Sequence, residues 1–183
     1  MTLDEYQEKA LRTAMYEDKI TYPALKLIGE TGEVCEKLGK ILRDQYGLIG
    51  IENKKQLAKE LGDVMWYVAV LTHDVGFKLS NFGLRRKEED VNKLFADETI
   101  HQIAVRMANF AVWTSMKAIV FEKHTKESCR KKDVAIGAGT MIEFIQRLAL
   151  MIDYNLDDIM EMNVGKLQSR FIRRKIKGSG DDR

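Results

Sequence analysis

Proline and cysteine are scarce in this sequence. A single proline among 183 residues, together with few runs of alternating polarity, argues against a strand-rich fold, whose many tight turns need proline and glycine. The two cysteines, Cys35 and Cys129, have no C-x-x-C spacing, so neither a zinc site nor a disulfide framework is indicated. We expect an all-α protein in a reducing, cytoplasmic setting.

The sequence also lacks an excess of one charge and a long apolar run. Its 30 basic and 28 acidic residues leave a net charge of +2, which provides no broad cationic surface for nucleic acid. No apolar stretch approaches the ~20 residues that cross a bilayer, and residues 1–5 do not resemble a signal peptide. We expect neither a membrane nor a nucleic-acid partner. The feature that would favour a nucleic-acid partner is a basic cluster at the end of the last expected helix, but positive charges also suit a helix C-terminus. The cluster consists of Arg170, Arg173, Arg174, Lys175 and Lys177.

Apolar residues recur at helical spacing along most of the chain. Thr2 and Glu5 have the spacing of a capping box, Pro23 suits the first turn of a helix, and Asn53 and Asn155 are candidate caps. Helices are expected at about residues 3–17, 23–43, 54–75, 97–121, 133–153 and 156–174, with a loop at 44–53 and a connector at 80–92. The pattern predicts one domain, residues 1–174, built as a bundle of about five to six helices, with a disordered tail at 175–183.

A weak internal repeat divides the expected domain. A shift that places Gly62 on Gly139 aligns apolar positions of two helices, but Glu60 and Asp63 have no acidic counterpart in the second half. Duplication and insertion of a helical segment are equally good explanations. In both cases we expect a catalytic half at about 1–82 and a non-catalytic helical half at about 95–174.

Two pairs of carboxylates stand three residues apart on the second and third expected helices. They are Glu30 with Glu33 and Glu60 with Asp63, and this spacing places each pair on one helix face. If the two helices pack as an antiparallel hairpin, the four acids converge. At about 6 Å and an effective dielectric of about 20, each like-charged pair costs about 3 kcal/mol, so cations are required. Oxygen ligands favour Mg²⁺, with Mn²⁺ as a substitute.

Three glycines interrupt these acidic helices. Gly29, Gly32 and Gly62 each cost up to about 1 kcal/mol relative to alanine. Close approach of a ligand and tight helix packing explain them equally well.

The sequences around the acids strengthen the prediction of a metal site. They read LIGETGEV at 27–34 and KELGDVMWY at 59–67, and NVGKLQSR follows at 163–170. This pattern resembles the MazG-like branch of the all-α nucleoside triphosphate pyrophosphohydrolase superfamily, with its E-x-x-E, E-x-x-D and closing N-x-x-K-L-x-x-R motifs. The resemblance is close over 24–79. Residues 83–135 have no clear counterpart, which is similar to the dimeric dUTPase-like relatives.

The resemblance implies an enzyme that converts a ribo- or deoxyribonucleoside triphosphate to the monophosphate and pyrophosphate, in nucleotide-pool cleansing. It implies that Glu30, Glu33, Glu60 and Asp63 are catalytic and hold Mg²⁺. One of these acids, or Glu36, would orient the attacking water. A homodimer or homotetramer is also implied.

Candidate substrate contacts come from three parts of the chain. Asn163, Lys166 and Arg170 match the closing motif of the family and are expected at the phosphates, as is Lys37, although surface ion pairing is an alternative role. Trp66 and Tyr67 follow the second acidic pair and are candidates for stacking on the base. For Trp66, core packing is the favoured interpretation; Tyr6 and Gln7, on the first helix, are further candidates near the base.

Two other readings compete with this one. A carboxylate-bridged di-iron bundle needs two Glu-x-x-His pairs, whereas only Glu98 and His101 have that spacing; the histidines are therefore interpreted as surface or packing residues. A non-enzymatic helical interaction module would use its apolar stripes to bind a partner. It predicts no hydrolysis and no response to Mg²⁺.

Overall fold

The computed structural model describes residues 1–123 and 128–172, and the side chains of 1–119 and 131–170. All regular secondary structure in this part of the chain is helical, as predicted, with seven α-helices and one 3₁₀ helix. They are α1 (Leu3–Leu11), α2 (Thr21–Gln45), α3 (Ile51–Asp74), η1 (Leu79–Asn81), α4 (Glu88–Leu94), α5 (Ile100–Lys123), α6 (Ser128–Met151) and α7 (Leu156–Ile172). The predicted disordered tail, His124 and most of the terminal basic cluster lie outside the described residues.

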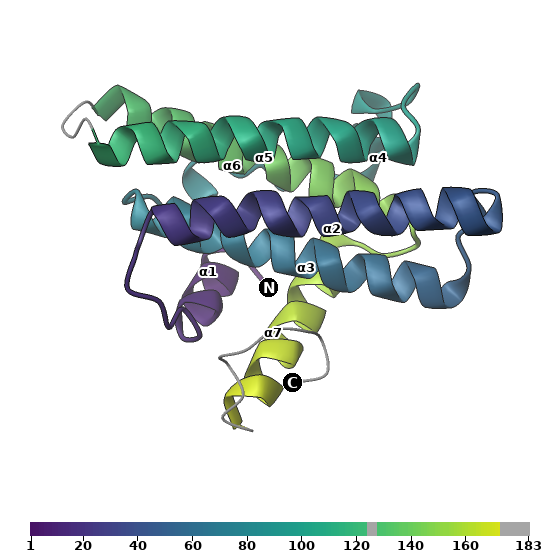
Figure 1. The fold of residues 1–183 in the computed structure, drawn as a ribbon, viewed down its shortest axis with the longest axis horizontal. Coiled ribbons are helices and arrows are strands. Elements are labelled where there is room, and N and C mark those ends of the chain that lie inside the picture. The colour runs from purple at the N-terminus through teal and green to yellow at the C-terminus, as the bar shows by residue number, and fades with distance from the viewer. Residues whose placement is uncertain (124–127, 173–183) are drawn as a thin grey trace.

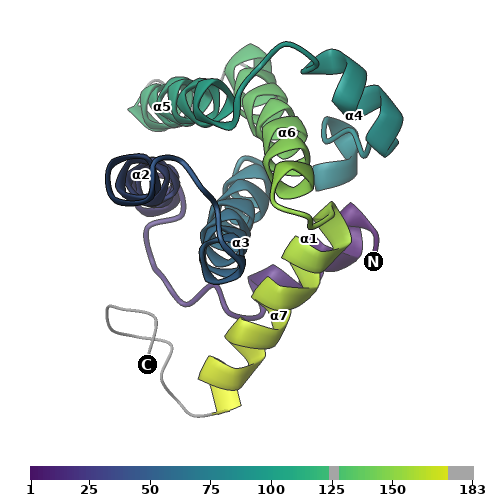
Figure 2. The same ribbon diagram turned by 90° about the vertical axis from the view of Figure 1, so that its right-hand side faces the viewer.

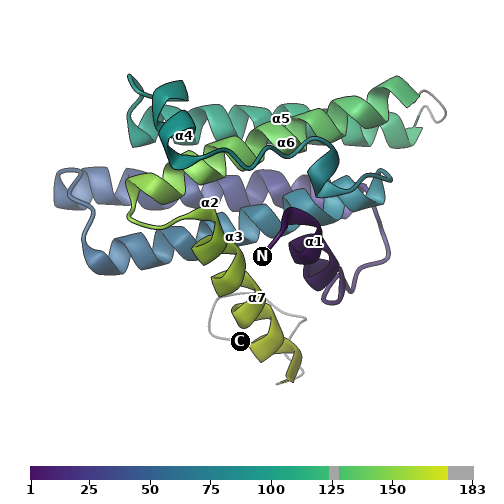
Figure 3. The same ribbon diagram turned by 180° about the vertical axis from the view of Figure 1, so that it is seen from behind.

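Two long antiparallel hairpins form the body of the molecule. Figure 1 shows the α2–α3 hairpin lying against the α5–α6 hairpin, and the end-on view in Figure 2 shows the four helices as a bundle. α2 packs on α5, and α3 packs on α6. α1 and α7 lie on the remaining side of α3, as the rear view in Figure 3 shows. α3 is therefore enclosed by four other helices, which explains its nearly continuous burial from Leu57 to Thr72.

The α2–α3 hairpin has clear local signals at its ends. The Asp18 carboxylate accepts the N–H of Thr21 at 2.7 Å, and Pro23 stands in the first turn of α2 as predicted. Gly50 is the N-cap of α3. The prediction that Asn53 caps this helix is wrong, because the helix begins one turn earlier and Asn53 lies inside its first turn.

α1 is shorter than its sequence pattern predicts. The capping box of Thr2 and Glu5 is present, but the helix ends at Leu11 instead of residue 17. Its end is held by one tertiary and one local hydrogen bond: the Ala10 carbonyl accepts the Trp66 indole N–H at 3.2 Å and the Thr13 hydroxyl at 2.8 Å. These contacts satisfy a terminal carbonyl that a longer helix would otherwise use.

The connector predicted at 80–92 contains two short helices, η1 and α4, which raise the helix count above five to six. α4 has seven residues and too little length to be stable alone. It is stabilised by packing, since Val91 and Phe95 are buried and the Phe95 ring lies 5.6 Å from that of Phe144 on α6. The cap of α7 is as predicted, with the Asn155 side chain accepting the Asp158 N–H at 3.0 Å.

The two glycines matched by the internal repeat both lie where another segment crosses closely. A Cβ at Gly62 would lie 3.0 Å from the Asn163 Cβ of α7, and one at Gly139 would meet the backbone of Phe82. Tight packing therefore accounts for each glycine separately. The division into a catalytic and a non-catalytic half stays a prediction.

One helix corrects the expectation that no apolar stretch is long enough to cross a bilayer. Among the described residues, the segment Lys131–Met151 is long and apolar enough to cross a membrane by length and composition, contrary to the expectation. However, 67% of the 18-residue apolar stretch in this segment is buried inside the bundle, because α6 packs on α5 and α3. The apolar residues of this helix are those of a core helix.

The crossing at Gly139 generates the first prediction. Gly139→Ala would place its Cβ 2.6 Å from the Phe82 carbonyl carbon, and since backbone cannot swing aside, we expect a loss of about 1–3 kcal/mol in the free energy of unfolding. Urea denaturation measures it. Gly39→Ala is the control, because its Cβ meets nothing within 4 Å; it should be neutral or stabilising by up to about 1 kcal/mol. Equal stability of both variants would contradict the close crossing.

Candidate metal centre

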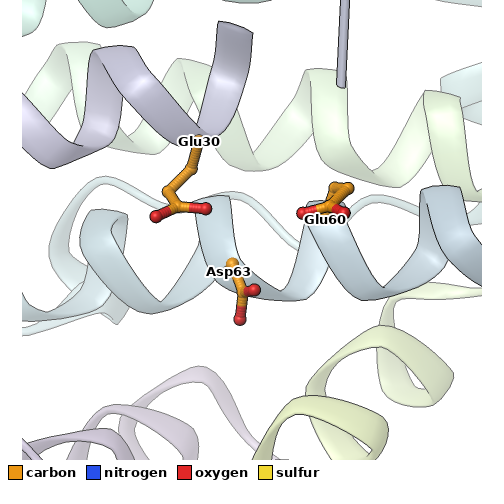
Figure 4. A group of neighbouring side chains, drawn as sticks. All are labelled: Glu30, Glu60 and Asp63. Atoms are coloured by element: carbon orange, nitrogen blue, oxygen red, sulfur yellow. The ribbon is translucent and has the colours of Figure 1, made fainter. Parts of the chain in front are cut away.

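Three of the four predicted acids converge between α2 and α3. Glu30 reaches from α2 toward Glu60 and Asp63 of α3, as Figure 4 shows, and one carboxylate oxygen of each lies within 4.8 Å of the others. We call these three residues the acidic cluster. Glu30 and Glu60 are buried, with 8% and 3% of their surfaces exposed. Three converging carboxylates offer the oxygen donors that hard divalent cations prefer.

Glu33, the fourth predicted ligand, lies outside this cluster. It is exposed on α2 and lines a pocket of about 250 Å³ beside the α2–α3 turn. The other lining residues are Glu36, Lys37, Lys40, Ile41, Asp44, Gln45, Asn53 and Gln56. A role for Glu33 in metal binding stays a prediction.

Two glycines of α2 near the acids, Gly29 and Gly32, have no packing neighbour where a side chain would begin. A Cβ on Gly29 or Gly32 would meet nothing within 4 Å, so close packing within the chain does not explain these two glycines. Gly62 differs, because Asn163 packs against it. The α2 surface at Gly29 and Gly32 is therefore not covered by another part of the described chain.

Each acid of the cluster has its own lysine partner. Lys26 and Lys37 come from α2, and Lys166 comes from α7. The pairs are Lys26 Nζ with Glu30 Oε1 at 2.8 Å, Lys37 Nζ with Glu60 Oε1 at 3.1 Å and Lys166 Nζ with Asp63 Oδ2 at 2.6 Å. Burial alone would lower the pKa of Lys26, but its hydrogen bond and charge interaction with Glu30 raise it above its ordinary value.

α7 brings the closing motif onto Asp63. The Asn163 amide donates to Asp63 Oδ1 at 3.2 Å and accepts the Tyr6 hydroxyl at 2.9 Å, and Arg170 is buried close enough for its charge to act on Asp63. Burial raises the pKa of Asp63, with a further contribution from the charge of Glu30, while Lys166 and Arg170 oppose the shift. The three motif residues thus gather around one carboxylate.

Comparison with known proteins agrees with this geometry. Residues 21–82 match the model of the MazG nucleotide pyrophosphohydrolase domain. The chain is also 41% identical over 102 residues to the gene 37 protein of Mycobacterium phage L5, an alignment that covers 51% of this chain and 86% of that protein. The chain belongs to the MazG family. No solved structure gives a significant match.

The MazG match ends before α7. It includes α2, α3 and all four predicted acids, whereas the closing-motif residues beside Asp63 and the tyrosine bonded to Asn163 come from helices outside it. Tyr6 lies before the matched range, and Asn163, Lys166 and Arg170 lie well after it. The candidate centre is therefore completed by parts of the chain beyond the matched domain.

An aromatic group lies next to the acidic cluster. It consists of Tyr16, Tyr22, Trp66 and Tyr67, whose rings contact one another with centroids 4.7 to 6.3 Å apart. The hydroxyls of Tyr22 and Tyr67 are 3.4 Å apart, and Lys26 Nζ lies 5.8 Å from the Tyr67 ring centroid. Burial and the Tyr22 hydrogen bond raise the pKa of Tyr67, as do the charges of Glu30 and Asp63.

The structure separates the roles of the predicted aromatic residues. The Trp66 indole is 8% exposed and donates to Ala10 and Thr13, which supports the packing interpretation. Tyr6 is fully buried beneath Asn163, and burial raises its pKa well above the ordinary value. It is not open to a base, so this suggestion is wrong.

Gln7 also has a structural role in this MazG protein. It is 4% exposed and donates to the carbonyls of Ala69 and Phe77, while its Oε1 accepts the Leu79 N–H. These hydrogen bonds tie α1 to α3 and η1. The suggestion that Gln7 contacts a base is therefore wrong.

Sequence reasoning missed Lys26, Tyr22 and Tyr16. Tyr22 and Lys26 lie eight and four residues before Glu30 on α2, so helical spacing alone could have placed them on its face. Tyr16 comes from the segment between α1 and α2, which the sequence pattern wrongly assigned to the first helix. Its position depends on the hydrogen bond from its hydroxyl to Asp74 Oδ2 at 2.8 Å.

No histidine joins the candidate ligand group found among the described residues. Glu98 pairs with Arg106, and His73 is exposed beside Asp74. The described residues therefore offer no Glu-x-x-His ligand set of the di-iron kind.

The buried Trp66 generates the second prediction. Trp66→Phe removes the N–H that Ala10 and Thr13 accept, so we expect a loss of about 1–3 kcal/mol in the free energy of unfolding, measured by urea denaturation. Binding of nucleotides should be unchanged. Unaltered stability combined with weaker nucleotide binding would instead favour a stacking role.

Proposed function

We propose that this MazG protein hydrolyses nucleoside triphosphates to monophosphate and pyrophosphate with the help of Mg²⁺, for which Mn²⁺ can substitute. The observation that carries the proposal is the acidic cluster, where oxygens from two helices lie within 4.8 Å of one another. The family match over the same helices supports it. Removal of unwanted or surplus nucleotides is the corresponding cellular role, and a cytoplasmic location is expected.

The proposed ligands of the metal are Glu30, Glu60 and Asp63, joined by Glu33 from the neighbouring turn of α2. Bound there, Mg²⁺ would supply neutralisation of polyphosphate charge and a bound water of lowered pKa. The chain's own part is to hold the acids ionised and in place. One of the acids, or Glu36 beside the pocket, is left to orient the attacking water.

Basic side chains border the acidic cluster on two sides. Lys166 and Arg170 approach it from α7, and Lys26 and Lys37 from α2. Ammonium and guanidinium groups form strong, charge-assisted hydrogen bonds with phosphate oxygens. We assign the polyphosphate of the substrate to these four basic side chains, and we assign to Asn163 the role of holding Asp63 in position.

The exposed member of the aromatic group, Tyr22, provides a place for the nucleobase. Tyr22 is 41% exposed, whereas Tyr67 lies mostly buried beneath it with its hydroxyl 3.4 Å away. Lys26 connects this group to Glu30. A nucleotide whose phosphates lie at the acidic cluster can therefore place its base on Tyr22.

Assembly into a homodimer or homotetramer, which the family resemblance implies, stays a prediction. The outer face of α5 is a candidate contact surface, since Val105, Val112 and Met116 are 65%, 40% and 61% exposed. Exposed apolar stripes of this kind often mark contacts between proteins.

The third prediction tests the reaction. The purified protein is incubated with ribo- and deoxyribonucleoside triphosphates, with Mg²⁺ or EDTA, and products are resolved by ion-exchange chromatography. We expect monophosphate and pyrophosphate with Mg²⁺ only. Glu60→Gln should reduce kcat by about a hundredfold or more, since even outer partners of metal ligands are worth roughly 10- to 100-fold.

Glu52→Gln is the matched control, because Glu52 lies on the same helix and is exposed; its activity should equal that of the parent. Diphosphate and orthophosphate as products would contradict the cleavage position while leaving the metal centre standing. Absence of turnover by folded protein would favour the helical interaction module.

The fourth prediction tests the base site. Tyr22→Leu removes the exposed ring, and because stacking is worth about 1–3 kcal/mol per base, KM should rise about tenfold with little change in kcat. Tyr22→Phe keeps the ring and should retain the parent KM. Steady-state kinetics on the preferred nucleotide measures both, and equal KM values for the two variants would place the base elsewhere.

A further inference from the structure

The three lysines of the acidic cluster balance its charge. Each carboxylate pairs with one ammonium group at 2.6 to 3.1 Å. The side chains of Lys26 and Lys37 are 40% and 28% exposed, whereas those of their partners Glu30 and Glu60 are 10% and 4% exposed. Lys26 and Lys37 therefore lie nearer to the solvent than the acids they pair with, while Lys166 and Asp63 are similarly exposed, at 16% and 18%.

A divalent cation and the lysines compete for the same oxygens. Three ammonium groups already match the three acids in number, and the buried Arg170 adds a further positive charge near Asp63. Adding two more positive charges is therefore electrostatically unfavourable unless ammonium groups withdraw. Lysine is suited to withdrawal, because its charge stands on a flexible four-carbon stem. A polyphosphate that arrives with the metal offers the displaced ammonium groups new anionic partners.

We propose that these lysines are exchangeable counter-ions, which pair with the carboxylates and transfer to phosphate oxygens when metal and polyphosphate bind together. The inference rests on the proposed metal centre and adds a coupling between its two ligands. Metal alone binds weakly because it must displace lysine, and polyphosphate strengthens metal binding by accepting the displaced charge. By linkage, metal strengthens polyphosphate binding by the same factor.

Lys37 gives the clearest test because its removal has opposite effects on the two ligands. Mn²⁺ is titrated into the full-length protein and followed by the electron paramagnetic resonance signal of free Mn²⁺, without and with inorganic tripolyphosphate. In Lys37→Met, Mn²⁺ alone should bind about tenfold more tightly, since a competing charge is gone. Tripolyphosphate should bind the Mn²⁺-loaded protein about tenfold more weakly, since a phosphate partner is lost.

Two matched variants isolate the charge at this position. Lys37→Arg keeps the positive charge and should not tighten Mn²⁺ binding. Lys117→Met removes a lysine of α5 that pairs with Asp133 of α6 at 3.5 Å, in the other hairpin, and should leave both affinities unchanged. Lys26→Met repeats the test at Glu30 and serves if Lys37→Met does not fold.

The outcomes separate this inference from the proposed function. Mn²⁺ binding that is lost in Glu60→Gln and tightened in Lys37→Met supports both. Binding lost in Glu60→Gln but unchanged or weakened in Lys37→Met overturns the exchange of lysines and leaves the metal centre standing. Mn²⁺ binding that does not depend on Glu60 overturns both proposals.

Discussion

The burial of carboxylates between α2 and α3 is the constraint on which the rest of this structure depends. Moving ions out of water costs several kcal/mol each, and removing one partner of a buried pair is strongly destabilising. Glu30 and Glu60 are nevertheless almost inaccessible. Lysines on α2 pair with these two acids, and Lys166 with Arg170 on α7 balances the charge of Asp63 beside them. α7 is thus required for the electrostatics of the α2–α3 hairpin as well as for packing.

The remaining helices hold that arrangement rigid. α3 has helices on all sides, and its acids are placed by a helix that cannot shift without disturbing α1, α6 and α7. The buried Tyr6 hydroxyl connects α1 through Asn163 to Asp63, and Gly62 permits the close approach of α7. The second hairpin supports α2 from outside, where the Ser115 hydroxyl donates to the Ala24 carbonyl at 2.7 Å. A metal centre needs this support, since loosely held ligands lose affinity.

The candidate site combines three surfaces that are adjacent only in the folded chain. The acidic cluster lies between the aromatic group and the pocket that Lys37 and Glu33 help to line. The MazG match covers residues 21–82, but the tyrosine of α1 and the cations of α7 come from outside it. In a metal-bound nucleotide, the base stacks on aromatic rings, the phosphates bind cationic side chains and the metal binds carboxylates, so these three surfaces must be neighbours. This neighbourhood is the physical basis of the proposed activity.

The sequence by itself determined the helical class and the positions of the long helices, because apolar periodicity is a local property. It also determined which acids share a helix face, since a three-residue spacing has one geometric outcome. Only the tertiary structure decided where α1 ends, that α4 forms, and that Glu33 lies apart from the other acids. It also decided that Tyr16 joins the aromatic group beside the acidic cluster. These features depend on contacts between residues far apart in the chain, which local spacing does not encode.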